Sequence, residues 1–429
     1  MTPSPQERQR PDPAESLTAR RRAAARRAIR ARVERSRRSG QVLVCDTTLR
    51  DGEQMPGVAF SPEQKARIAL ALERAGIHTI EAGFAASGRG EMEGIRAVAH
   101  AVSSAVVMSL ARIRRPDIDA ADDALAGLAP HRRGVALFVA TSPFQRGQGT
   151  DRDRGRLLAR IEESVSYARR AFDIVAFAAE DASRTETGFL CDCLRVAIEA
   201  GATSVAVPDT VGLLLPGMAA ELVRKVQDGV PNLDQALLAV HFHDDLGLAA
   251  ANTLAAVQSG VQVIQCTVGG LGERAGNAAL EEVAVALRLH GETIGRELGL
   301  RTTELTRLCR LVGEYSGVPA VPNKAVTGAN IFATEAGIHQ EGLLRDVRNY
   351  QPYPPELVGA DPGFRLALGK HSGRQGLRHR LAALGLELPP AALEELLSRI
   401  KELPRPADAD ADETLAEMAR QLVREGVRG

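Results

Sequence analysis

The sequence predicts an α/β fold: a (β/α)8 TIM barrel with an appended C-terminal helical module. Eight short apolar segments follow one another from residue 41, and segments with helical periodicity separate them. Near-continuous apolar strands are typical of a parallel sheet covered on both faces, and eight such units over roughly 250 residues match a barrel. An open doubly wound sheet would usually carry a glycine-rich turn after its first strand, whereas this first strand is followed by TTLRDGEQ.

The predicted strands alternate with capped helices. Ser61 is a candidate N-cap with Pro62 at the first helical position, and Gly76 ends that helix. A second helix ends in the same way at Gly201. The strands expected in chain order are Gln41–Asp46, His78–Phe84, Ala105–Ala111, Gly134–Thr141, Asp173–Asp181, Ser204–Thr210, Leu237–His243 and Val263–Val268.

The chain divides into three parts by composition. Residues 1–40 hold twelve arginines against four acids, and we expect a disordered tail there rather than a transit peptide or a nucleic-acid arm. The barrel is expected over residues 41–290. Beyond that point the alternation stops, so residues 291–429 are expected to form the helical module.

Composition excludes some classes of protein. Hydrophobic residues make up 44% and charged residues 25%, as in an ordinary globular protein. No apolar run approaches the roughly 20 residues needed to cross a bilayer. Five scattered cysteines have no spacing typical of a zinc ribbon, and they predict free thiols in a reducing cytoplasm.

Unusual polar residues end the predicted strands, where the active sites of barrels lie. His241 and His243 are two apart on one strand, so both side chains should face the barrel axis. Together with the carboxylate of Asp46, they would form a site for a divalent ion, Zn, Mn, Co or Mg, with positions left open for substrate.

Several motifs resemble those of the acyl-CoA-dependent 2-oxo acid condensing enzymes, the homocitrate, 2-isopropylmalate and citramalate synthases. The resemblance covers roughly residues 41–375, and within it we expect the chain to be nearest to the nitrogen-fixation type of homocitrate synthase. The strings that carry it are DTTLRDGEQMPGVAFSPEQK, IEAGF, EDASRT, VPDTVG, HFHDDLGLAAANTLAA, GGLGERAGNAALEEV, EAGIHQEGLL and LGKHSG.

The resemblance implies a set of site residues. It assigns the metal to Asp46, His241, His243 and Asn277, and catalytic roles to Arg50, Glu180, His339 and Tyr350. Substrate contacts are expected from Gln54, Thr210 and Arg146, and contacts with CoA from Gly270, Gly272 and Gly276. It also implies acetyl-CoA as co-substrate, and a homodimer in which the module with His339 reaches the neighbouring barrel.

The implied reaction joins the acetyl group of acetyl-CoA to the keto carbon of a small 2-oxo acid. Relatives usually carry His and Lys after the fourth strand, whereas this chain reads TSPFQRGQGTDRDRG there. Because Arg89, Arg112 and Arg146 lie near strand ends, we expect a dianionic acceptor and a homocitrate-type product. Phosphonopyruvate as acceptor (a 2-phosphonomethylmalate synthase), 2-isopropylmalate or citramalate synthesis, and a lyase or aldolase of the same barrel type remain alternatives. A non-catalytic nucleic-acid-binding relative is the remaining rival.

Overall fold

The computed structural model describes residues 40–146 and 153–425. The described residues form two compact units, with the division between Pro319 and Ala320. The first unit therefore extends past residue 290 and includes part of the range that the sequence assigned to the module. The tail expected over residues 1–40 lies outside the described residues except for Gly40. Among the described residues, no helix is both long and apolar enough to span a bilayer.

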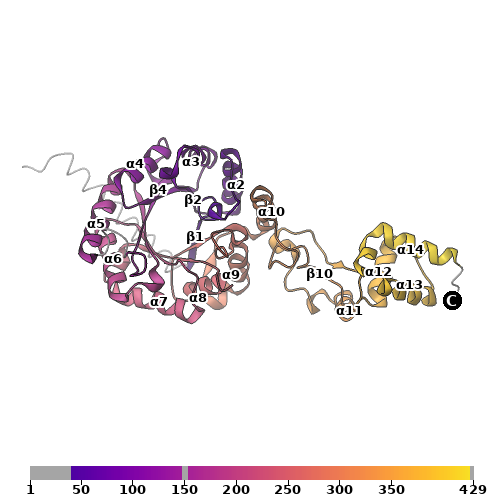
Figure 1. Ribbon diagram of the computed structural model, residues 1–429. Coiled ribbons are helices and arrows are strands. Elements are labelled where there is room, and N and C mark those ends of the chain that lie inside the picture. The colour runs from indigo at the N-terminus through magenta and orange to yellow at the C-terminus, as the bar shows by residue number, and fades with distance from the viewer. Residues whose placement is uncertain (1–39, 147–152, 426–429) are drawn as a thin grey trace, which may run out of the picture. The chain divides into compact units, whose positions relative to one another are not determined.

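The first unit is a closed parallel barrel, which confirms the predicted fold class (Figure 1). Closure follows because β1 pairs with β2 on one side and with β8 on the other. A ninth strand, β9 (Glu297–Leu298), pairs in parallel with the first residues of β1. The barrel strands are β1 Gln41–Asp46, β2 Thr79–Gly83, β3 Val106–Arg112, β4 Arg133–Ala140, β5 Ile174–Glu180, β6 Ser204–Asp209, β7 Leu237–Phe242 and β8 Val263–Cys266.

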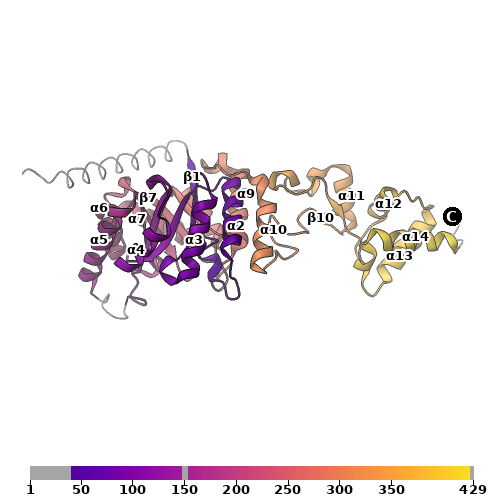
Figure 2. The same cartoon turned by 90° about the horizontal axis from the view of Figure 1, so that it is seen from above.

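Helices form the outer ring of the barrel and are visible from above in Figure 2. The cap predicted at Ser61 is present: its side chain accepts the Gln64 N–H, and the Gln64 side chain accepts the Ser61 N–H. Gly76 ends that helix in the left-handed conformation, with φ of 92°. The helices of this unit are α2 Pro62–Ala75, α3 Arg89–Ala101, α4 Arg115–Ala124, α5 Arg154–Ala171, α6 Thr187–Ala200, α7 Pro216–Gly229, α8 Ala249–Gln258, α9 Leu280–Ile294 and α10 Leu305–Ser316.

The pleat of the strands decides which side chains reach the barrel interior. Leu43 of β1 packs with Leu237 and Val263 from β7 and β8. Leu43, Cys45 and Ala239 line an interior cavity of about 100 Å³. Residues at alternate positions along these strands therefore face the axis, and those between them face the helices.

The second unit is mainly helical. Its helices α12 (Arg374–Ala383), α13 (Pro390–Glu402) and α14 (Asp412–Arg424) enclose their own apolar core. Helix α11 (Gly337–Arg345) precedes them, and the short strands β10 (Ala333–Thr334) and β11 (Arg365–Leu366) pair in parallel.

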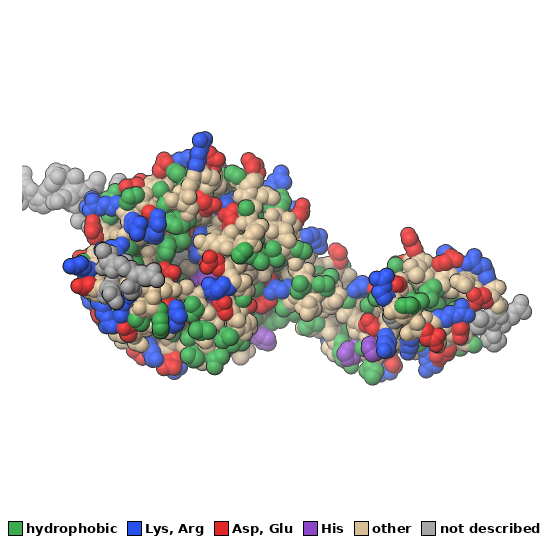
Figure 3. Space-filling view, in the orientation of Figure 1, with side chains coloured by type: hydrophobic (Ala, Val, Ile, Leu, Met, Phe, Trp, Pro, Cys, Tyr) green, Lys and Arg blue, Asp and Glu red, His purple; other side chains and the backbone are tan. Residues whose placement is uncertain are grey.

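The surface of the described residues in view carries basic and acidic side chains interspersed, without a large area of one sign (Figure 3).

Candidate active site

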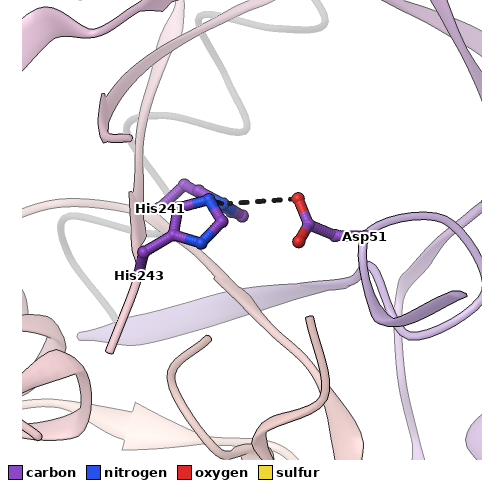
Figure 4. A group of neighbouring side chains, drawn as sticks. All are labelled: Asp51, His241 and His243. Carbon is purple, nitrogen blue, oxygen red and sulfur yellow. Dashed lines mark hydrogen bonds and ion pairs between the residues drawn. The ribbon is translucent and has the colours of Figure 1, made fainter. Parts of the chain in front are cut away.

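Three side chains converge at the C-terminal end of the barrel: Asp51, His241 and His243 (Figure 4). All three are buried, and their potential ligand atoms lie within 4.8 Å of one another. The two Nε2 atoms of the histidines are 3.2 Å apart, and Asp51 Oδ2 is 3.7 Å from His241 Nε2. Because Leu237 and Ala239 face the barrel interior, alternation carries His241 and His243 to the same side.

Asp46 does not join the histidines, contrary to the expectation from the sequence. Since Leu43 and Cys45 point inward, Asp46 at the end of β1 faces the helix layer. Its two oxygens accept hydrogen bonds from the backbone N–H and the hydroxyl of Thr48, both at 3.0 Å. Burial, together with the nearby charge of Glu281, raises the pKa of Asp46 to about 7. The carboxylate beside the histidines belongs to Asp51 instead.

A tight turn after β1 returns Asp51 to the axis. The carbonyl of Thr47 accepts the N–H groups of Arg50, Asp51 and Gly52 at 3.1, 2.8 and 3.1 Å. This turn places Arg50 next to Asp51, and the Arg50 Nη1 contacts the Asp51 carboxylate. The sequence carried no signal for this arrangement, because β1 reads as a continuous apolar run and does not show which of its residues face the axis.

Arg50 lies between two buried carboxylates. Its Nε and Nη2 atoms reach the same oxygen of Glu81, at 2.9 and 2.8 Å. Burial disfavours the charged guanidinium, but Glu81 and Asp51 outweigh that effect and raise the pKa of Arg50. Glu81 lies near the end of β2 and is 2% exposed. Its role as the partner of Arg50 was not predicted from the sequence.

Asn277 completes the group around Asp51. Its Nδ2 donates to Asp51 Oδ1 at 2.8 Å and to the Leu271 carbonyl at 2.9 Å. Its Oδ1 is buried and has no hydrogen-bond partner among the described residues. The backbone of Asn277 forms a bridge with His243, so the two side chains come from adjacent segments. The structure thus brings together Asp51, His241, His243 and Asn277.

The glycines expected to bind CoA shape the segment before Asn277. Gly270, Gly272 and Gly276 all have positive φ values, of 72°, 157° and 91°. A Cβ atom on Gly276 would lie 1.9 Å from the Gly270 carbonyl oxygen, so no larger residue fits there without displacing the backbone. This close contact sets the position of Asn277. Binding of CoA by the segment stays a prediction.

The protonation states of the cluster suit a divalent cation. Burial lowers the pKa of His241 to about 3 and lowers that of His243, so both imidazoles are neutral near pH 7. Burial would raise the pKa of Asp51, but the neighbouring Arg50 guanidinium holds it well below its usual value. Two neutral imidazoles, one carboxylate and the unpartnered oxygen of Asn277 are a donor set that such an ion takes.

The other barrel residues expected at the site, Glu180, Thr210 and Gln54, differ in burial and in hydrogen bonding. Glu180 is the last residue of β5, and burial raises the pKa of its carboxyl. The Thr210 hydroxyl accepts the Asp181 N–H at 2.9 Å, so it also holds the end of β5. Gln54 is exposed in the turn after β1. These side chains are near strand ends, as predicted, and their contacts with substrate stay predictions.

Arg146 is held by neighbours outside the cluster. Its Nη1 donates to the Thr141 carbonyl at 3.1 Å, its Nη2 to Glu186 at 2.8 Å, and its guanidinium lies over the Phe189 ring. Substrate binding by Arg146 therefore stays a prediction. The sequence could not reveal Glu186 as a partner, because it lies 40 residues further along the chain.

His339 and Tyr350 belong to the second unit. Their rings stack with centroids 4.2 Å apart and planes 29° from parallel. Both side chains are exposed. They form a pair within that unit, and their catalytic roles stay predictions.

Comparison with known proteins identifies the family. Residues 41–312 match the HMGL-like family model, and residues 326–408 match the model described as homocitrate synthase post-HMGL domain-like. A 2-isopropylmalate synthase of Nitrosomonas eutropha is 43% identical over 85% of this chain and 71% of its own length. The protein of the same name from Geobacillus kaustophilus is 44% identical over 83% of this chain and 69% of its own length.

Solved structures show the same barrel at lower identity. The HMG-CoA lyase of Bacillus subtilis has a TM-score of 0.56 and 19% identity, covering 66% of this chain and 96% of its own. The hydroxymethylglutaryl-CoA lyase of Pseudomonas aeruginosa has a TM-score of 0.55 and 23% identity, covering 64% of this chain and 93% of its own. The likeness to the lyases extends to the fold alone, whereas the two relatives from Nitrosomonas eutropha and Geobacillus kaustophilus, at 43% and 44% identity, are named as synthases. The chain therefore belongs to the HMGL-like family, and within it to the enzymes that condense acetyl-CoA with a 2-oxo acid.

Proposed function

We propose that Asp51, His241 and His243, with Asn277, would hold a divalent ion that serves the condensation of acetyl-CoA with a keto acid. The observation that carries this proposal is the convergence of the three ligand atoms within 4.8 Å in a buried, inward-facing group. When bound, such an ion supplies Lewis-acid polarisation of the keto group.

Arg50 is proposed to stabilise the charge that develops on oxygen during carbon–carbon bond formation. Its guanidinium is always protonated, and Asp51 and Glu81 fix its position beside the cluster. The acetyl methyl group must also lose a proton to a base. Glu180 is a candidate, because a carboxyl whose pKa is raised by burial accepts protons more readily. The acid–base role of His339 and Tyr350, and the homodimer, remain proposals from the family resemblance.

For the acceptor, we propose first a 2-oxo acid with an apolar side chain, such as 2-oxoisovalerate. Val106 and Met108 of β3 and Ala136 of β4 line the interior, so alternation also directs Leu110 and Phe138 inward, nearer the site. The two relatives reported above, at 43% and 44% identity, are named 2-isopropylmalate synthases. The arginines expected to bind a second anion already have acidic partners: Arg89 with Glu93, Arg112 with Asp117, and Arg146 with Glu186.

A dianionic acceptor with a homocitrate-type product is the second candidate, and one observation favours it. Arg146 and Arg154 share the single carboxylate of Glu186, at 2.8 and 2.5 Å, and both lie over the Phe189 ring. Two guanidinium groups with one carboxylate leave an excess positive charge near the end of β4. A second carboxylate or a phosphonate is the chemistry that such an excess would bind.

The acceptor is identified by following thiol release with acetyl-CoA and 2-oxoisovalerate, pyruvate, 2-oxoglutarate or phosphonopyruvate. For a dianionic acceptor, Arg146→Met should lower kcat/KM for that substrate about tenfold or more and spare 2-oxoisovalerate. For an apolar acceptor, Phe138→Ala should lower kcat/KM for 2-oxoisovalerate and spare the dianions. If none of the four 2-oxo acids causes thiol release from acetyl-CoA, the proposed substrate class is wrong.

The metal site is tested with a matched pair of aspartates from the same strand and turn. Asp51→Asn should abolish binding of Mn²⁺ and activity, whereas Asp46→Asn should keep both, because Asp46 faces away from the histidines. Dialysis against a chelator should remove activity, and a divalent ion should restore it. The reverse result for the two aspartates would refute the proposed metal site.

A further inference from the structure

Lys65 of α2 is a fully buried cation that the reaction described above does not use. Its side chain is 1% exposed, and it is among the largest fully buried side chains of the chain. Burial of a lysine ammonium is expensive unless every donor is matched by an acceptor. The acceptors around Lys65 therefore indicate what its burial achieves.

Four oxygen atoms surround the Lys65 ammonium. Two are carboxylate oxygens, Glu53 at 2.5 Å and Glu91 at 2.9 Å. The other two are backbone carbonyls, Leu49 at 3.2 Å and Ala82 at 3.3 Å. Three ammonium protons and four acceptors leave no donor unmatched.

The two carbonyls belong to the segments that carry the site. Leu49 directly precedes Arg50 and Asp51, and Ala82 directly follows Glu81. Lys65 thus joins the backbones of two segments whose side chains meet in the Arg50–Glu81 pair. Glu53 extends the link, because its second oxygen accepts the Phe60 N–H at 2.7 Å, at the end of the same segment.

Glu91 extends the link on the other side. Its Oε1 accepts from Lys65, and its Oε2 accepts the Phe84 N–H at 2.9 Å, which fixes the segment after β2. Two glycines make room for this contact. A Cβ on Gly83 would lie 2.3 Å from the Glu91 carboxylate, and one on Gly94 would lie 2.9 Å from the Lys65 side chain.

We propose that Lys65 is a positioning residue for the condensation: it sets the separation of the Arg50–Asp51 turn from Glu81 and so places the guanidinium and the Asp51 carboxylate. This inference rests on the proposed metal site and deepens it. A misplacement of about 1 Å costs up to 100-fold in rate, and loss of a group that orients a metal ligand costs about 10- to 100-fold in metal affinity or activity.

The test is Lys65→Met, which keeps an unbranched apolar side chain, one atom shorter than lysine, and removes the ammonium. We expect kcat to fall about 10- to 100-fold, KM for acetyl-CoA to stay within about threefold, and the Kd for Mn²⁺, measured by electron paramagnetic resonance, to rise about tenfold or more. The matched control is Lys225→Met, which removes a surface lysine paired with Glu221 on α7. A folded Lys65→Met protein with unchanged kcat and Mn²⁺ affinity would show a purely structural lysine and overturn the proposal.

A second pair of variants decides the question where Lys65→Met does not fold. Glu91→Gln keeps the ammonium and the shape of the site but weakens the link to Phe84, and it should lower kcat about fivefold or more and weaken Mn²⁺ binding. Glu93→Gln on the same helix, an exposed partner of Arg89, should change neither. Equal behaviour of the two glutamine variants would overturn the proposal.

Failure of the proposed metal site gives a different pattern. His241→Ala should abolish Mn²⁺ binding if that site is correct. Unchanged Mn²⁺ affinity in His241→Ala would refute the site itself. Loss of binding in His241→Ala together with unchanged binding in Lys65→Met and Glu91→Gln would refute only the role of Lys65.

Discussion

Replacing Arg50 with methionine should destabilise the barrel and inactivate it for two separable reasons. The side chains of Glu81 and Asp51 are only 3% and 5% exposed, so the variant leaves two buried carboxylates without their cation. At 2.8 Å and an effective dielectric constant of about 20, the Arg50–Glu81 attraction alone is about 6 kcal/mol, partly offset by desolvation. Removing one partner of a buried pair typically costs about 3–5 kcal/mol of unfolding free energy.

The double variant Arg50→Met/Glu81→Gln separates stability from catalysis. Neutralising Glu81 removes one of the two unpaired charges, so we expect about half of the lost unfolding free energy to return. Activity should stay about 10²- to 10³-fold below the unmodified enzyme in both variants, because neither has a cation for the developing oxyanion.

Urea unfolding with a chelator present measures the free energies, and thiol release with saturating divalent ion measures the activity. The single variant must first be shown to bind acetyl-CoA. An unfolding free energy that is unchanged in Arg50→Met would refute the stabilising contacts of Arg50 with Glu81 and Asp51. Recovery of activity in the double variant would refute the role of the guanidinium in the reaction.

Three further predictions test other parts of the chain. Burial alone would raise the pKa of Glu73, but hydrogen bonds from the N–H groups of residues 103–105 hold it at about 2. Glu73→Gln should therefore lower the free energy of unfolding by about 1–2 kcal/mol, a value that allows for solvent screening. Because that pKa is lowered on folding, the loss of unfolding free energy relative to the unmodified protein should be complete above pH 4.5 and vanish as the pH falls to about 2. A loss that grows in acid would contradict this explanation. Leu396→Ala, in the core of the second unit, should cost about 2–5 kcal/mol in thermal unfolding of that unit, and a loss below about 1 kcal/mol would contradict its complete burial. Gly342→Ala should displace the Tyr350 ring, 2.4 Å from the added Cβ, and so alter the tyrosine ring signals in NMR spectra, whereas unchanged signals would contradict the packing.

The sequence predicted the barrel closely because strand burial and helix caps are local signals. The range of β1 agrees with the expectation, and the other strands differ from it by one or two residues at their ends. The family and the reaction class were also confirmed by the comparisons. These features depend on residues close together in the chain or on long motifs in the expected order.

The candidate site was only partly predictable, because its contacts join residues far apart. His241 and His243 were found from spacing alone, since a strand places alternate residues on one face. The sequence favoured Asp46 over Asp51 because the path of the turn that follows β1 has no periodic signal, and because the continuous apolar run of β1 does not show which face Asp46 takes. The partners Glu81 for Arg50, Lys65 for Leu49 and Glu186 for Arg146 depend on the three-dimensional path of the chain.

The cavity inside the barrel has a consequence for how firmly the site is supported. Four alanines, Ala136, Ala176, Ala206 and Ala239, line this cavity where barrels usually carry bulky branched side chains. Glu81 lines the same space, so the partner of Arg50 borders a cavity on that side rather than closely packed hydrocarbon. Hydrostatic pressure acts on such internal volume, and a larger side chain introduced at one of the four positions would occupy part of it.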